Sequence, residues 1–104
     1  MIARVTTFEG DPERMEEGAR IFRDQVVPWL RDSTGFRGLI VLVDRENERA
    51  MGISFWTTKE TATDAYTSGA TLRDEVAASV GTTMTGEEFY EVVTAQALAL
   101  DDDA

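Results

Sequence analysis

Two kinds of hydrophobic spacing alternate along the chain. Residues 1–9, MIARVTTFE, form a short run of β-branched and aromatic side chains, which is typical of a β-strand. From Asp11-Pro12 onward, apolar residues recur every three or four positions as far as Leu30. This spacing predicts a helix with Asp11 as its N-cap and Pro12 in its first turn. Pro28 lies within the same pattern and is expected to kink the helix or loosen its last turn.

The middle of the chain predicts a β-hairpin followed by a second helix. Residues 35–56 contain two apolar runs on either side of the charged stretch Asp44–Arg49, in which Asn47 is suited to a turn conformation. Residues 57–60, TTKE, have the S/T-x-x-E spacing of a capping box. Apolar residues then follow at helical spacing, so we expect a helix that runs to about Gly81.

The end of the chain completes an α+β pattern. Residues 87–100, EEFYEVVTAQALAL, predict a last strand, and residues 101–104 form an acidic tail that we expect to be disordered. The predicted order is β-α-β-β-α-β. This is the ferredoxin-like arrangement, a four-stranded antiparallel sheet with both helices on one face. Residues 1–100 are therefore expected to form a single domain.

The predicted strands are apolar on both of their faces. Leu39–Val43 is apolar without interruption, and Met51, Ile53 and Phe55 alternate with residues that include Trp56. Two helices in a chain this short cover only one face of a sheet, so the other face needs a second source of burial. We expect that source to be a second copy, packed sheet to sheet in a homodimer. The alternative is a monomer with an open apolar face, which is unusual in soluble proteins.

Composition excludes several classes of function. The 104 residues include neither cysteine nor histidine, so disulfides, thiolate chemistry and histidine-ligated metals or haem are excluded. Twenty acidic residues oppose ten basic ones, which disfavours nucleic acid as a partner. The longest apolar run is far shorter than the ~20 residues that span a membrane. These features predict a cytoplasmic protein without a metal, a cofactor or a membrane segment.

Two passages stand out beside the element order: VVPWLRDSTGFRG at 26–38 and GISFWTTKETA at 52–62. In the element order and in these passages, the sequence resembles the antibiotic biosynthesis monooxygenase-like group of dimeric α+β barrel proteins. The resemblance implies a homodimer whose two sheets form a barrel, with a pocket in each subunit between the helices and the sheet of that subunit. It also implies an apolar or aromatic small molecule as the ligand.

Better-understood members of this group include cofactor-independent monooxygenases of aromatic polyketides and enzymes that degrade haem. In the monooxygenases, an asparagine on the third strand lies four residues before a tryptophan that matches Trp56. This chain has Gly52 at that place, and its only asparagine is Asn47. The haem-degrading relatives use histidine, which this chain lacks. The catalytic residues are therefore not identified from the sequence.

Candidate ligand-binding residues follow from strand phase, helix stripes and residue chemistry. Trp56 shares a strand phase with small side chains, which either leave room for a ligand or let the helices approach closely. Arg4 lies inside a strand, where it either binds an acidic ligand or pairs with a glutamate of the last strand, such as Glu88 or Glu91. Tyrosines offer phenols for hydrogen bonds, and aromatic residues on helix stripes either close a pocket or only fill the core. The predicted ligand-binding set is Arg4, Phe22, Trp29, Gly52, Trp56, Tyr66 and Tyr90.

Two functions are compatible with these features. The first is a homodimeric enzyme that binds an aromatic metabolite and oxidises it with dioxygen, without a cofactor. The second is a dimer that keeps the barrel and binds a ligand or a partner but has lost the chemistry. Gly52 and the absence of histidine favour the second function, whereas the small side chains beside Trp56 favour a retained cavity.

Overall fold

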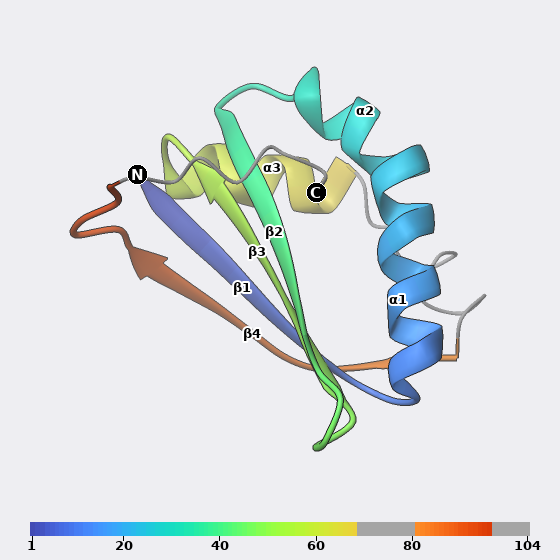
Figure 1. Ribbon diagram of the computed structural model, residues 1–104. Coiled ribbons are helices and arrows are strands. Elements are labelled where there is room, and N and C mark those ends of the chain that lie inside the picture. Colours follow the sequence, from blue (N-terminus) through green and yellow to red (C-terminus); the bar gives the residue numbers. More distant parts are fainter. Residues whose placement is uncertain (69–80, 97–104) are drawn as a thin grey trace.

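The computed structural model describes residues 1–68 and 81–96. Its strands form one antiparallel sheet in the order β2-β3-β1-β4 (Figure 1). The elements are β1 (Ile2–Glu9), α1 (Pro12–Ile21), η1 (Phe22–Val26), α2 (Val27–Arg31), β2 (Phe36–Asp44), β3 (Arg49–Trp56), α3 (Lys59–Ser68) and β4 (Thr83–Glu91). The predicted α+β ferredoxin-like class is confirmed.

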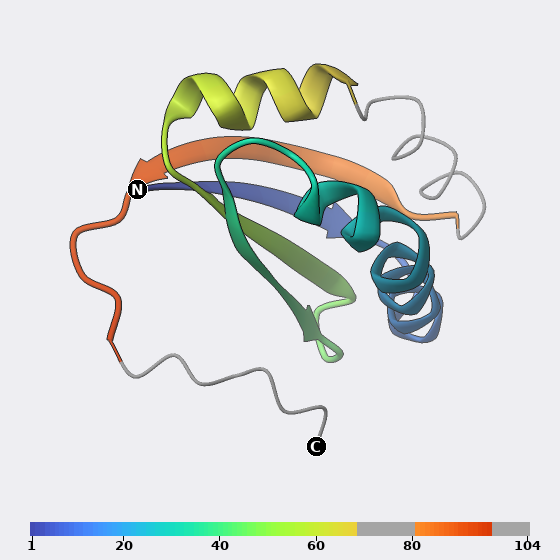
Figure 2. The same cartoon turned by 90° about the horizontal axis from the view of Figure 1, so that it is seen from above.

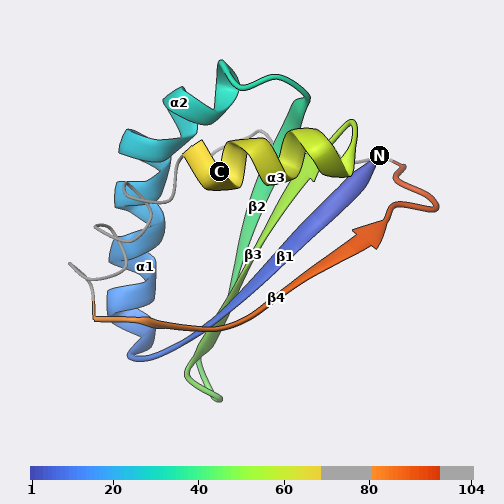
Figure 3. The same ribbon diagram turned by 180° about the vertical axis from the view of Figure 1, so that it is seen from behind.

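Strand periodicity divides the sheet into two different faces. Arg4 of β1, Val41 of β2 and Ser54 of β3 line one cavity with residues of α1, α2 and α3, so all the helices lie over this face. Figures 2 and 3 show α3 lying along the sheet and the α1–η1–α2 segment beside it, next to β2. The alternate residues, such as Val5 and Ile53, face the other way, where no helix of the described chain covers them.

The first helix begins and bends as its sequence dictates. Asp11 is the N-cap, and its carboxylate accepts a hydrogen bond from the Glu13 N–H at 2.9 Å. Before Pro28, the helix widens into the π-helical turn η1, in which the Val27 N–H donates to the Phe22 carbonyl. A proline ring clashes with the carbonyl four residues earlier, so the wider turn lets the helix continue through Pro28 into α2.

Asn47 lies in the hairpin turn, as predicted, whereas the cap of α3 is displaced by one residue. In the hairpin turn, Glu48 takes the left-handed conformation with φ 52°, whereas Asn47 donates to the Asp44 carboxylate from its backbone and its side chain. These hydrogen bonds, followed by the one from Arg49, lower the pKa of Asp44.

At the start of α3, Thr58 and Thr61 bond reciprocally, so the cap is Thr58 and not the predicted Thr57 with Glu60. The predicted continuation of this helix over residues 69–80 lies outside the described chain.

The predicted bounds of the last strand are wrong. It spans Thr83–Glu91, not residues 87–100, and pairs along the whole of β1. The Val92 N–H still donates to the Met1 carbonyl at 2.9 Å. Residues 92–96 are not part of the sheet, and Val93 is 91% exposed. Residues 97–100 and the tail lie outside the described part of the chain.

The core occupies one end of the space between helices and sheet. Trp56, at the end of β3, and Val26, in η1, are each 2% exposed and pack with Leu30, Ala62 and Ala65. The ring of Phe36 meets that of Trp56 edge to face, with centroids 5.3 Å apart. The helices are thus fixed to the sheet at the Trp56 end.

The Asp11 cap gives a direct test of the α1 start. Asp11→Ala is expected to lower the free energy of unfolding by about 1 kcal/mol, because the Glu13 N–H loses its acceptor. Asp11→Asn keeps an acceptor oxygen and should change stability by only a few tenths of a kcal/mol. Urea unfolding followed by circular dichroism measures both variants, and equal losses would contradict the cap.

Candidate functional site

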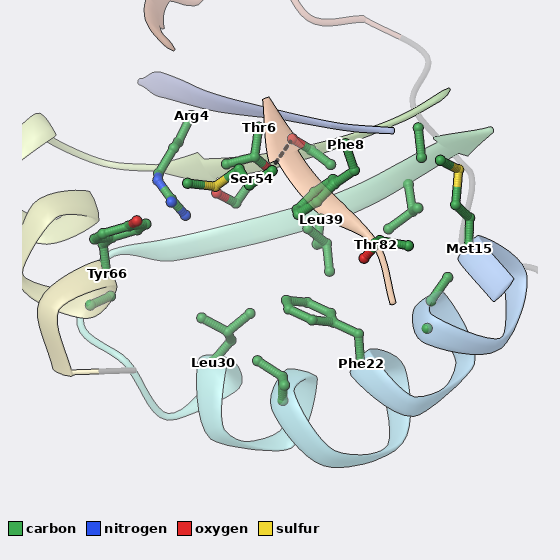
Figure 4. A pocket seen from close by; sticks show the side chains of 18 of the residues that line it. Arg4, Thr6, Phe8, Met15, Phe22, Leu30, Leu39, Ser54, Tyr66 and Thr82 are labelled. Atoms are coloured by element: carbon green, nitrogen blue, oxygen red, sulfur yellow. Dashed lines mark hydrogen bonds between the residues drawn. The ribbon is translucent and has the colours of Figure 1, made fainter. Parts of the chain in front are cut away.

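A mostly apolar cavity of about 190 Å³ lies between the helices and the sheet. Its walls come from every part of the described fold. The sheet supplies Arg4, Thr6, Phe8, Leu39, Val41, Ala50, Gly52, Ser54, Trp56 and Met84, and the helices supply Met15, Gly18, Ala19, Phe22, Val26, Trp29, Leu30, Ala65 and Tyr66. Figure 4 shows Phe22 and Leu30 reaching from the helices toward the sheet, and Thr6 and Leu39 on the opposite wall. The small residues of β3 leave this space open, because large side chains there would fill it.

One end of the cavity is polar. The Arg4 guanidinium is 9% exposed and lies 3.8 Å from the centroid of the Tyr66 ring, a cation–π contact. Its Nη2 donates to Glu87 Oε2 at 2.7 Å. Thr6 donates to the Gly52 carbonyl at 3.2 Å, so its oxygen keeps acceptor capacity toward the cavity. This end combines a cation with two hydroxyl groups, those of Thr6 and Ser54.

Trp56 is part of the core and also part of the cavity wall. Its indole N–H donates to Ser54 Oγ at 2.9 Å, so the donor is already used within the protein. The ring therefore offers a ligand its apolar surface and not its N–H. Ser54 is buried at 7% exposure and retains its own O–H, which can donate to an oxygen atom in the cavity.

Gly52 lies on the floor of the cavity, in the sheet between Thr6 of β1 and Val41 of β2. A Cβ built at this position would meet Thr6 Oγ1 at 3.2 Å as its nearest neighbour. A longer side chain at position 52 would thus extend into the cavity and take up part of its volume.

The structure brings together six of the seven predicted ligand-binding residues: Arg4, Phe22, Trp29, Gly52, Trp56 and Tyr66. Tyr90 lies elsewhere. It pairs with Ala3 on the opposite face of the sheet, where it is 52% exposed and its hydroxyl donates to Glu88. This hydrogen bond, followed by the negative charge of Glu88, raises the pKa of the phenol.

Arg4 pairs with a glutamate of the last strand, as expected, but the residue is Glu87 and not one of the two examples, Glu88 and Glu91. Arg4 is paired with Phe89 across the β1–β4 ladder, which places Glu87 diagonally opposite on the same face. Glu88 points to the other face, and Glu91 lies opposite Ile2. The sequence did not single out Glu87, because local spacing does not fix the register of β4 against β1.

The cavity includes residues that the sequence reading did not select. Thr6 and Phe8 share the strand phase of Arg4, so alternation from Arg4 would have found them. Met84 was missed because its segment was not assigned to a strand. Within residues 1–68 and 81–96, no cluster of acidic side chains could hold a metal ion. None of the described helices combines the length and apolar character needed to cross a membrane.

Sequence comparisons find relatives without a known function. Over 75 residues, the chain is 36% identical to Uncharacterized protein Rv2558 of Mycobacterium tuberculosis (strain H37Rv), which covers 72% of this chain and 32% of the relative. Uncharacterized protein Rv2557 of the same strain is 33% identical over 87 residues, 84% of this chain and 39% of the relative. The chain thus spans about a third of the length of these curated relatives. No model of a known protein family matches the sequence.

Structure comparisons identify the fold. A monooxygenase from the gene ActVA-Orf6 of Streptomyces coelicolor, solved with nanaomycin D, gives a TM-score of 0.75 at 17% identity and covers 90% of this chain and 88% of its own. SnoaB, a cofactor-independent oxygenase from Streptomyces nogalater, gives a TM-score of 0.69 at 15% identity and covers 92% of this chain and 96% of its own. A further antibiotic biosynthesis monooxygenase gives a TM-score of 0.60 at 14% identity. The antibiotic biosynthesis monooxygenase-like fold expected from the sequence is confirmed.

The bond between Trp56 and Ser54 gives a testable consequence at the site. Ser54→Ala is expected to lower the free energy of unfolding by about 1–2 kcal/mol, because the buried indole N–H loses its acceptor. Ser33→Ala is the matched control. The Ser33 hydroxyl donates to the Trp29 carbonyl, which also accepts from the Asp32 N–H, so this loss should be smaller. Urea unfolding followed by circular dichroism compares them, and equal effects would contradict the anchoring role of Ser54.

Proposed function

We propose that the protein is a homodimer that binds an apolar, aromatic small molecule in the cavity of each subunit. The observation that carries this proposal is the cavity itself, apolar along most of its length and polar at the Arg4 end. Ligand sites in proteins commonly combine apolar walls with a few polar groups that fix orientation. A planar ring fits between the Phe22 side of the helices and the floor at Gly52.

The polar end favours a ligand that carries an oxygen atom. Arg4 and the Ser54 hydroxyl both offer hydrogen-bond donors, and the Arg4 cation would stabilise a phenolate or an enolate. Such an anion can react directly with dioxygen. When an activated CH₂ group becomes a carbonyl, one oxygen atom enters the product and the other leaves as water, and the substrate supplies all four electrons. The first candidate activity is therefore cofactor-independent oxidation, in line with the activities named for the structural neighbours.

A second candidate is a binding protein without catalytic activity. Among the described cavity-lining residues, only Arg4 and Tyr66 carry titratable groups. Neither is a histidine or a carboxylate, the groups that most often act as general bases. Gly52 also stands where the resembling monooxygenases carry asparagine, so a donor to the substrate oxygen is missing at that point. These two features favour ligand binding without turnover.

The uncovered face of the sheet supports the homodimer. Eight residues on this face, drawn from all four strands, are apolar or aromatic: Ala3, Val5, Ile40, Leu42, Met51, Ile53, Phe55 and Tyr90; Thr7 and Glu88 also lie on it. Leu42 is 49% exposed and Tyr90 is 52% exposed. A second copy that packs on this face would remove these side chains from water, which is favourable by about 25 cal/mol per Å² of apolar area.

A charge in the middle of this face tests the dimer. Ile53→Glu is expected to raise the dimer dissociation constant about 100-fold or more, because it would place two unpaired carboxylates in the interface. Thr63→Glu, on the exposed surface of α3, should leave the dimer intact. Light scattering after size-exclusion chromatography gives the mass of each form. A monomeric wild-type protein would contradict the proposal.

Gly52 separates the two candidate activities. We expect the wild-type protein to bind polycyclic phenols and ketones with an activated CH₂ group, as measured by calorimetry. Gly52→Asn would supply the missing donor to the substrate oxygen and is expected to raise the rate of oxygen uptake about tenfold or more, with Gly52→Ala as the control. Uptake by the wild-type protein supports the enzyme, and binding without uptake supports the binding protein. The absence of binding would contradict both.

A further inference from the structure

A second depression, which we call the entry groove, runs between the α1–η1–α2 segment and the edge strand β2. Its volume is about 790 Å³, larger than that of the inner cavity. Four residues line both spaces: Ala19, Phe22, Leu39 and Val41. The entry groove therefore adjoins the inner cavity.

The boundary that the two spaces share, which we call the junction, is lined by apolar side chains. Figure 4 shows Phe22 extending from the helix toward Leu39 on the sheet. Phe22 is the first residue of the π-helical turn η1, a type of turn that occurs frequently at functional sites. The inner cavity of about 190 Å³ is smaller than the ~300 Å³ at the low end of usual ligand sites. A ligand larger than one ring system would therefore extend past Phe22 into the entry groove.

The helical side of the entry groove is basic. Arg20, Arg23 and Arg31 line it and are exposed to solvent. Arg23 also contacts Asp24 at 3.1 Å, an exposed pair of little energetic weight. Among the described residues that line the groove, Glu16 is the only acid, and its carboxylate is paired with Arg45.

This basic edge contrasts with the rest of the protein. The chain has twenty acidic and ten basic residues, and its formal net charge is −10. A negative surface repels anions at a distance, so three arginines at the mouth of an apolar cavity mark the place where an anion is attracted. The opposite side of the groove is apolar, with Phe36, Leu39 and Val43 from β2.

We propose that the ligand is an amphipathic organic anion, an aromatic body with a carboxylate or sulfonate group, that enters through this groove. The aromatic body occupies the inner cavity and the acidic group stays at the arginines. This inference rests on the proposed ligand-binding function and adds to it the charge of the ligand and its direction of entry.

Two fluorescent probes with the same aromatic body test the proposal. The anion 8-anilinonaphthalene-1-sulfonate and the neutral N-phenyl-1-naphthylamine differ only in the sulfonate group. The test protein carries glutamine in place of Arg20, Arg23 and Arg31. It is expected to bind the anionic probe about fivefold more weakly than the wild-type chain, because exposed ion pairs each contribute modestly. Its affinity for the neutral probe should change less than twofold.

A matched control removes the same number of positive charges away from the groove. It carries glutamine in place of Arg14, Arg49 and Lys59, which do not line either space. The control should bind both probes within twofold of the wild-type protein. A second variant, Val41→Trp, fills the junction from the strand side, where Val41 is 41% exposed and tolerates a larger side chain. If the probes bind at this site, Val41→Trp should weaken the binding of both at least tenfold.

The outcomes separate this inference from the proposed function. If the groove variant loses affinity for the anionic probe alone, the proposal of an anionic ligand is supported. If the groove variant and the control variant weaken binding of the anionic probe equally, the inference is overturned. In that case, the cavity remains a binding site if Val41→Trp weakens binding of the neutral probe. If Val41→Trp changes neither probe, binding occurs elsewhere, and both the inference and the proposed function are contradicted.

Discussion

The anchoring of Trp56 at the end of β3 is the interaction on which the rest of the structure depends. The indole packs under Val26 and Leu30, meets Phe36 edge to face, and has its N–H satisfied by Ser54. A large ring at this one end holds the helices at a fixed distance from the sheet. The residues that precede it on the same strand phase, Gly52 and Ala50, are too small to fill that distance. A cavity therefore follows from the same strand that closes the core.

Each face of the sheet has its own role in the function that we propose. On the helix side, a cation and two hydroxyl groups lie at one end of an apolar space, and arginines border its entrance. On the other side, apolar residues face away from every described helix. Burial of this face against a second copy would leave the cavity and its entry groove accessible, since both lie on the helix side. The dimer and the ligand site thus place no competing demands on the same residues.

The sequence predicted the architecture more completely than the site. Apolar spacing gave the element order, and the two-residue period placed Gly52, Ser54 and Trp56 on one face of the sheet, because this period is a direct consequence of strand geometry. The resemblance implied that this face lies under the helices and directed attention to Trp56, whereas Tyr66 was selected from the apolar stripe of its helix. The start of β4 was missed because residues 83–86 have no apolar alternation, and their pairing with β1 is a long-range effect.

The details of the site depend on the same long-range register. Arg4 selects Glu87 because β1 and β4 are aligned with Arg4 opposite Phe89, and Tyr90 falls on the outer face for the same reason. Position in the sequence alone does not distinguish Glu87 from Glu88. The basic edge of the entry groove was also hidden, since Arg20, Arg23 and Arg31 become one lining only when the helix lies beside β2.

The central claim is that the space beside Trp56 is a ligand site and not a packing defect. A crystal structure of the protein with N-phenyl-1-naphthylamine tests it most directly. The account predicts one probe molecule per chain, with its naphthalene ring between Phe22 and Gly52 and its outer ring in the entry groove. A probe bound only to the outer face of the sheet, with side chains closed over Gly52, would contradict it.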